Sequence, residues 1–368
     1  MNATTKPTAT TKATARLHDM GQSLWLDDIT RELLDSGTLA RHIAELSLTG
    51  LTSNPSIFDH AITHGGKYDD AIRLLSRRGF ASEALFFELA FDDLGRAADL
   101  FLPAHERTGG VDGWVSLEVS PLLAYDTKAT IAEAKRLSAR AHRRNLFVKI
   151  PGTKEGLPAI EESIFAGVAV NVTLLFSAAQ YEAAADAYMK GLERRVRGGL
   201  PADVPSVASV FISRWDRAVL DKVPDQLRGT LGIAVGKLSY KAYRDVLDSG
   251  RWQRLANSGA RPQRLLFAST STKDPKAPDT LYVEAFAAPN TINTIPEATL
   301  KAFADHGKVT GALPRDASDA AEILAEHEKV GIDVKALADK LQVDGAKAFV
   351  DSWKDLLKAI ESKSRALH

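Results

Sequence analysis

Short apolar runs of strand length recur along the chain, and longer stretches with apolar residues at helical spacing separate them. This alternation is typical of parallel strands joined by crossover helices. The runs cover Ser23–Asp27, Leu46–Thr52, Trp114–Glu118, Leu146–Ile150, Val168–Thr173, Val207–Ser213, Arg264–Ser269 and Thr291–Pro296. Eight parallel strands are the number that closes a TIM barrel, so the pattern predicts an α/β fold with a single (β/α)8 barrel.

Several of the separating stretches are longer than a minimal strand–helix unit needs. Helical spacing predicts extra helices at about 59–110 and 215–260, and C-terminal helices at about 314–366. No linker rich in Gly, Ser or Pro and no repeat with a period of about 20–50 residues interrupts the chain after its first residues. We therefore expect residues 19–368 to form one barrel with helical additions.

Residues 1–18 differ in composition from the rest. They are rich in Thr and Ala, carry scattered basic residues and lack an apolar core, which excludes a secretory signal. A start poor in acidic residues also resembles an organelle transit peptide, but Pro7 and the missing apolar face favour a disordered tail. Charge breaks every apolar run well before ~18 residues, so we expect a soluble, cytoplasmic protein without a membrane span.

A polar side chain stands at or just after the carboxyl end of seven successive apolar runs. These side chains are Asp27, Asn54, Glu118, Lys149, Asn171 with Thr173, Ser213 and Ser269. In a barrel the carboxyl ends of the strands converge on one mouth, where active sites of this fold lie. Polar residues also end strands without any function, but seven in succession favour a pocket.

Composition and charge exclude several kinds of chemistry. The absence of cysteine removes thiolate nucleophiles, disulfides, Fe–S clusters and Cys-ligated zinc. The 47 basic and 47 acidic residues cancel, and no basic stripe is visible that would attract a nucleic acid. Neither a closely spaced histidine set for a metal nor a GxxxxGK[ST] loop occurs. We therefore expect no metal and no nucleic-acid partner.

Lys149 is the most informative of the polar side chains. It stands in the segment NLFVKIPGT, where its neighbours otherwise specify burial. Desolvation disfavours an ammonium ion, so burial favours the neutral amine that attacks a carbonyl group to form a Schiff base. A lysine that extends from the strand end to solvent is the alternative. The PGT segment directly after it ends the strand and favours an amine held at the mouth.

The other candidates fall into carboxylates and amides. Asp27 and Glu118, at the ends of two different runs, are a pair of the kind that divides general acid and base work, although salt bridges would explain them equally well. Asn54 and Asn171 are uncharged donors that could hold a carbinolamine or an oxyanion. Asn54 precedes a proline, so a role in a turn is its alternative.

Two segments are candidates for binding an anion. Ser213 with Arg214 follows the sixth run, and Ser269 with Lys273 follows the seventh. Loops after the last strands of such barrels often bind phosphate, and two cations with hydroxyl groups fit one phosphomonoester. Arg217 competes with Arg214 for the same role.

Several segments resemble the transaldolase family. LTSNPSIF at 51–58 closely resembles its first signature, and LFVKIPGTKEG at 146–156 resembles its second, around the Schiff-base lysine. LWLDD, SLEVSP, NVTLLFSAAQY, VASVFISR and FASTSTKDP also agree in order. The resemblance spans roughly residues 20–310 and is to the longer bacterial type.

The resemblance implies a cofactor-free enzyme that moves a dihydroxyacetone unit between sugar phosphates, from sedoheptulose 7-phosphate or fructose 6-phosphate to an aldose phosphate. It implies that Lys149 forms the imine and that Asp27 takes the proton of the C4 hydroxyl as the C3–C4 bond breaks. Glu118 with Thr173 would position a water during carbinolamine dehydration. The substrate-binding residues that it implies are Asn54 and Asn171 for hydroxyl groups and Ser213, Arg214 and Ser269 for phosphate.

The chain departs from the better-known short members at the phosphate end. In those members, the second arginine that binds phosphate lies two residues beyond the serine equivalent to Ser269. This chain has Ser271 at that position, and we expect Lys273 to take the role of the arginine. The first arginine stands closer to the preceding serine than in those members. The sequence therefore does not decide whether Arg214 or Arg217 binds the phosphate. A fructose 6-phosphate aldolase-type lyase and a barrel that binds sugar phosphates without turnover are the alternative functions.

Overall fold

The computed structural model of the chain describes residues 12–367, and a closed barrel of eight parallel strands forms its centre. The strands follow one another in chain order, and β8 closes the circle by pairing with β1. Their bounds are β1 Ser23–Asp27, β2 Leu48–Thr52, β3 Trp114–Glu118, β4 Leu146–Pro151, β5 Val170–Leu175, β6 Ser206–Phe211, β7 Gln263–Ala268 and β8 Ile292–Ile295. Each predicted run coincides or overlaps with one strand, and the (β/α)8 prediction is confirmed.

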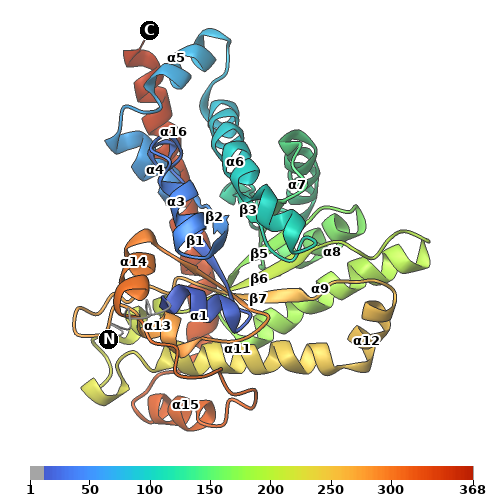
Figure 1. Cartoon of the computed structure of the whole chain (residues 1–368), viewed down its shortest axis with the longest axis vertical. Coiled ribbons are helices and arrows are strands. Elements are labelled where there is room, and N and C mark those ends of the chain that lie inside the picture. The colour runs from blue at the N-terminus through green and yellow to red at the C-terminus, as the bar shows by residue number, and fades with distance from the viewer. Residues whose placement is uncertain (1–11, 368) are drawn as a thin grey trace, which may run out of the picture.

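Helices separate the strands along the chain (Figure 1). Their bounds are α1 Ala13–Asp19, α2 Arg31–Asp35, α3 Thr38–Glu45, α4 Pro55–His64, α5 Asp69–Arg77, α6 Ser82–Arg107, η1 Pro121–Leu123, α7 Thr127–Ala141, α8 Gly156–Phe165, α9 Ala178–Arg197, α10 Ser213–Val219, η2 Asp225–Leu227, α11 Leu231–Asp248, α12 Gly250–Asn257, α13 Leu281–Ala285, α14 Glu297–His306, α15 Ala320–Lys329 and α16 Val334–Ala366. The stretches predicted to hold extra helices overlap with α4 to α6 and α10 to α12, and the C-terminal stretch contains α15 and α16.

Strand alternation divides the barrel interior into an aromatic level and a polar level. Trp25, Trp114 and Phe147 belong to one buried cluster, with 4.1 Å between the ring centroids of Trp114 and Phe147. Successive side chains of a strand point to opposite faces, so the residue two positions further on faces the same side. Asp27 follows Trp25 at this spacing and Lys149 follows Phe147, which carries both polar groups to the carboxyl ends.

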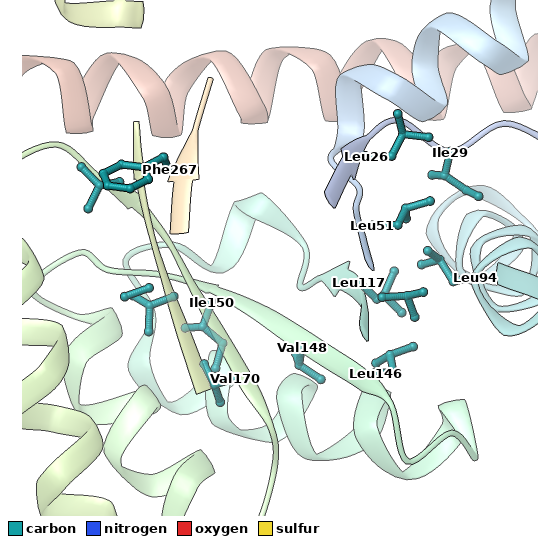
Figure 2. Packing of buried hydrophobic residues seen from close by; sticks show 14 of the residues in the cluster. Leu26, Ile29, Leu51, Leu94, Leu117, Leu146, Val148, Ile150, Val170 and Phe267 are labelled. Carbon is teal, nitrogen blue, oxygen red and sulfur yellow. The ribbon is translucent and has the colours of Figure 1, made fainter. Parts of the chain in front are cut away.

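The intervening strand residues form the contact with the surrounding helices. Figure 2 shows Leu26, Leu51 and Leu117, from three neighbouring strands, in the same apolar cluster as Leu94 of α6. All four side chains are at most 1% exposed. This apolar layer on the outside of the strands fixes their positions and therefore the positions of the polar side chains at their ends.

The prediction of a disordered tail over residues 1–18 is wrong for residues 13–18. Ala13–Asp19 forms helix α1, and Ala13, Thr14 and Leu17 on it are buried. Residues three and four apart lie on the same face of a helix, and this face packs near α14 and β1. The Thr- and Ala-rich composition hid a short amphipathic helix whose order comes from tertiary contact. The remaining part of the predicted tail, 1–11, lies outside the described residues.

The C-terminal helix α16 extends from the outer helices to the mouth of the barrel. It contacts α4, α5 and α6, and it also reaches β5 and η1 at the carboxyl side of the strands. In Figure 1 it is the red helix beside α4. Within residues 12–367, no helix combines the length and apolar character needed to cross a membrane.

Candidate active site

A cavity of about 230 Å³ lies at the carboxyl ends of the barrel strands. Its lining consists of Asp27, Thr52, Asn54, Ser56, Lys149, Thr173, Ser209, Phe211, Arg214, Ala268, Ser269, Ser271, Lys273, Thr294, Pro296 and Phe349. Seven of the residues predicted from the sequence are among them. The other three, Glu118, Asn171 and Ser213, each contact a residue of the lining.

Strand register brings the predicted catalytic side chains to one level. Glu118 of β3 pairs with Lys149 of β4, and Lys149 pairs in turn with Asn171 of β5. On the other side of the barrel, Asp27 of β1 pairs with Thr52 of β2. Neighbouring strands are about 5 Å apart, so side chains at matched register positions can exchange protons or hydrogen bonds.

The Lys149 amine is buried and has two partners. Its Nζ donates a hydrogen bond to the backbone oxygen of Ser53 at 2.8 Å and lies 3.1 Å from a carboxylate oxygen of Glu118. The two side chains of this ion pair are 6% and 5% exposed. The alternative of a strand-end lysine that extends into solvent is therefore wrong. The amine instead lines the cavity.

Glu118 and Thr173 supply groups with unused hydrogen-bonding capacity next to the amine. Burial raises the pKa of Glu118, and the positive charge of Lys149 partly offsets this effect. Among residues 12–367, the Thr173 hydroxyl has no hydrogen-bond partner, and the Glu118 carboxylate has only the Lys149 contact. A carboxylate with a raised pKa accepts a proton more readily than an ordinary glutamate does.

Asp27 lies in the same cavity on the opposite side of the barrel. Its Oδ1 accepts a hydrogen bond from the Thr52 hydroxyl at 2.9 Å, and Thr52 lies 2.7 Å from the Thr294 hydroxyl. Burial raises the pKa of Asp27, while the charge of Lys149 and the bond from Thr52 act to lower it. Asp27 is therefore held in place by two strands and has the properties of a general base.

The two predicted asparagines have different surroundings. The Oδ1 of Asn54 accepts a hydrogen bond from the backbone N–H of Ile57 at 3.2 Å and caps the first turn of α4. The turn role predicted as an alternative is thus present, and Asn54 also lines the cavity. Asn171 is fully buried, donates to Ser116 at 3.2 Å and accepts from Ser209 at 2.7 Å. On this strand pair it is Ser209 that lines the cavity.

Two cations and two hydroxyl groups, from α10 and from the segment after β7, also line the cavity. Arg214, Ser269, Ser271 and Lys273 all line it, and the Lys273 amine donates to Ser271 at 3.0 Å. Burial and the nearby charge of Arg217 lower the pKa of Arg214, whose guanidinium lies 5.0 Å from the ring centroid of Phe211. Cationic side chains beside hydroxyl groups can bind a phosphate through charge and hydrogen bonds.

The structure also separates the competing residues of this anion site. Arg217 is exposed and lines a smaller neighbouring cavity with Ser213. The Ser213 hydroxyl lies 2.9 Å from the Ser269 hydroxyl, within hydrogen-bonding distance. Among the residues that the structure describes, no group of three or more acidic, His or Cys side chains could hold a metal ion.

Comparison with known proteins is consistent with this geometry. The family model described as Transaldolase/Fructose-6-phosphate aldolase matches residues 24–360. The chain belongs to this family. It is 45% identical to a transaldolase of Parafrankia sp. (strain EAN1pec), with 96% of this chain and 98% of that protein covered. It is 46% identical to one of Thermobifida fusca (strain YX), with 95% and 98% covered, and 43% identical to transaldolase 2 of Streptomyces coelicolor, with 97% and 98% covered.

Membership in the transaldolase/fructose-6-phosphate aldolase family confirms the resemblance found in the sequence motifs. Sequence reasoning nevertheless did not predict several residues of the lining, among them Ser209, Thr294 and Phe349. Ser209 and Thr294 stand at inward positions of β6 and β8, and two-residue alternation along those strands could have found them. Phe349 comes from α16, some 200 residues after Lys149, and no local pattern marks it.

Proposed function

We propose that the chain is a transaldolase that transfers a dihydroxyacetone unit from sedoheptulose 7-phosphate to glyceraldehyde 3-phosphate, giving erythrose 4-phosphate and fructose 6-phosphate. The observation that carries the proposal is the buried Lys149 amine, which lines the cavity 3.1 Å from the Glu118 carboxylate. An amine beside a proton-accepting group meets the requirement for Schiff-base formation with a ketone. The reaction belongs to the non-oxidative pentose phosphate pathway, which we assign to the cytoplasm.

The first half-reaction forms the imine. The Lys149 ammonium first passes a proton to Glu118, its partner in the ion pair, and the neutral amine then attacks C2 of the ketose. Loss of water from the carbinolamine then needs a proton on the departing oxygen. Glu118 and the Thr173 hydroxyl are suited to hold the water molecule that carries this proton, since both have hydrogen-bonding capacity left among residues 12–367.

Cleavage of the carbon–carbon bond follows. Asp27 takes the proton of the C4 hydroxyl as the C3–C4 bond breaks, and the protonated imine accepts the electron pair. The aldose phosphate leaves, and the three-carbon unit stays on Lys149 as an enamine. Asp27 returns the proton when C3 attacks the acceptor aldehyde. Its raised pKa fits a group that accepts and returns a proton in one cycle.

Polar groups along the cavity match the remaining parts of the substrate. Asn54 and Ser209 bind hydroxyl groups of the three-carbon unit, with Asn171 orienting Ser209 through the 2.7 Å hydrogen bond. Arg214, Ser269, Ser271 and Lys273 bind the phosphate. The local cations attract a phosphomonoester although the net charge of the chain is zero.

Borohydride reduction in the presence of fructose 6-phosphate tests the proposal. It should add a reduced three-carbon or six-carbon unit to the peptide that contains Lys149, and Lys149→Met should abolish the adduct. Arg214→Gln should raise the KM for phosphorylated donors, and Arg217→Gln is the matched control that should not. An unmodified Lys149 in active protein would refute the Schiff-base assignment.

The acceptor requirement separates transfer from simple cleavage, because the family also includes fructose-6-phosphate aldolases. A transaldolase forms product only when an acceptor aldehyde is present. Substantial release of free dihydroxyacetone from fructose 6-phosphate without an acceptor would instead identify a lyase. Binding of sugar phosphates without adduct formation would identify a non-catalytic barrel.

A further inference from the structure

The C-terminal helix α16 is fixed across the mouth of the barrel by polar contacts. The Gln342 amide nitrogen donates to the backbone oxygens of Gly152 at 3.0 Å and Leu174 at 2.9 Å, at the carboxyl ends of β4 and β5. Further along the helix, the Ser352 hydroxyl lies 2.7 Å from that of Ser56, which follows β2. The helix is therefore attached on both sides of the cavity.

A glycine lets α16 approach the cavity closely. A Cβ added at Gly345 would lie 3.0 Å from Nη1 of Arg214 and 3.1 Å from Cδ2 of Leu174. Leu174 itself has a φ of 59°, beside an irregularity in the pairing of β5 with β6. Such an irregularity bends a strand locally, and here it carries the Leu174 carbonyl to Gln342.

Phe349 is the residue that α16 contributes to the cavity. Its ring centroid lies 5.9 Å from the Lys149 amine and 5.7 Å from the guanidinium carbon of Arg214. The side chain is only 4% exposed, and it packs in the same apolar cluster as Phe211. Phe349 therefore lies next to both groups that we assign to the imine and to the phosphate, on a helix attached at both sides of the cavity.

We propose that Phe349 is a specificity-determining residue that favours transfer over hydrolysis, since its ring keeps water away from the three-carbon unit on Lys149. This inference rests on the proposed function. The enamine can react in two ways, and atoms and charge are conserved in each. In transfer, C3 forms a bond to the acceptor aldehyde carbon. In release, a proton from solvent adds to C3, water adds to C2, and the C2–N bond breaks to free dihydroxyacetone and the amine.

The ratio of free dihydroxyacetone to sedoheptulose 7-phosphate tests this inference, with fructose 6-phosphate as donor and erythrose 4-phosphate as acceptor. Because both products come from the same adduct, the ratio does not depend on the fraction of active protein. We expect Phe349→Ala to raise the ratio about tenfold or more. Phe349→Leu, which keeps most of the bulk, should stay near the wild-type ratio. Val343→Ala, on an exposed part of α16, is the matched control.

The outcomes distinguish the inference from the function on which it rests. An unchanged ratio in Phe349→Ala, with the Lys149 adduct still trapped, overturns the inference and leaves the proposed function intact. A rise as large in Phe349→Leu or Val343→Ala also overturns it, because loss of the ring would then not be the cause. If alanine displaces α16 and prevents trapping, Phe349→Val takes its place. Failure to trap the wild-type adduct refutes both.

Discussion

The buried ion pair between Lys149 and Glu118 makes the stability of the fold depend on the lysine that we propose as the nucleophile. In Lys149→Met the side chain keeps its length but loses its charge, so the Glu118 carboxylate remains buried without its cation. Removing one partner of a buried pair is much more costly than removing both, because the remaining charge is left without compensation. We therefore expect the variant to be inactive and also less stable than the wild type.

The size of the effect depends on pH. Loss of one partner of a buried pair costs about 3–5 kcal/mol when the other partner is charged. Burial already raises the pKa of Glu118 above its ordinary value of 4.5, and loss of the lysine raises it further. A group whose pKa is higher in the folded state contributes stability below its ordinary pKa and loses it as the pH rises through the folded value. The deficit of Lys149→Met should thus be smaller at pH 5 than at pH 8.

Urea unfolding at both pH values measures this deficit. A loss of this size should lower the urea midpoint at pH 8 by about 1 M. The double variant Lys149→Met/Glu118→Gln removes both charges and keeps both shapes, so it should regain most of the lost stability. A single variant as stable as the wild type at pH 8, or one that loses more stability at pH 5 than at pH 8, would refute this reasoning.

Three further predictions concern Asp27, Gly345 and Asp28. Asp27→Asn should still be trapped by borohydride while transfer falls by about 10²-fold or more, and loss of the adduct would contradict the role of Asp27 in cleavage. Gly345→Ala should displace the Arg214 guanidinium and raise the KM for fructose 6-phosphate up to about tenfold at similar kcat, which steady-state kinetics would measure. Burial, with the charges of Asp27 and Glu297, raises the pKa of Asp28 to about 6, so wild-type stability falls as the pH rises through that value. Asp28→Asn should therefore be the more stable protein at pH 8, by on the order of 2 kcal/mol in urea unfolding, and should lose this advantage at pH 4.

Strand positions and their polar ends were predictable because both are local properties of the sequence. Apolar runs of strand length separated by helical stretches predict the barrel, and closure of a parallel barrel necessarily brings the carboxyl ends together. Lys149 and Asp27 could be placed in one pocket on that reasoning alone. The strand β1 even has the predicted bounds, Ser23–Asp27.

Choices between nearby residues needed the three-dimensional arrangement. Arg214 and Arg217 are three apart on the short helix α10, and only the docking of α10 turns Arg214 to the cavity while Arg217 stays exposed. Asn171 and Ser209 stand on neighbouring strands, and the hydrogen bond between them puts the hydroxyl rather than the amide at the cavity wall. Neither result depends on residues close in sequence.

The sequence by itself therefore determined the barrel and the level at which its polar side chains, including Lys149, lie. These features follow from periodicity and strand ends, which are properties of short segments. Only the tertiary structure decided which residue of the C-terminal helix lines the site. The position of Phe349 over Lys149 depends on where α16 docks, which the fit of Gly345 against Arg214 and the bonds of Gln342 determine. Such contacts join segments far apart in the chain, so a local hydrophobic pattern cannot predict them.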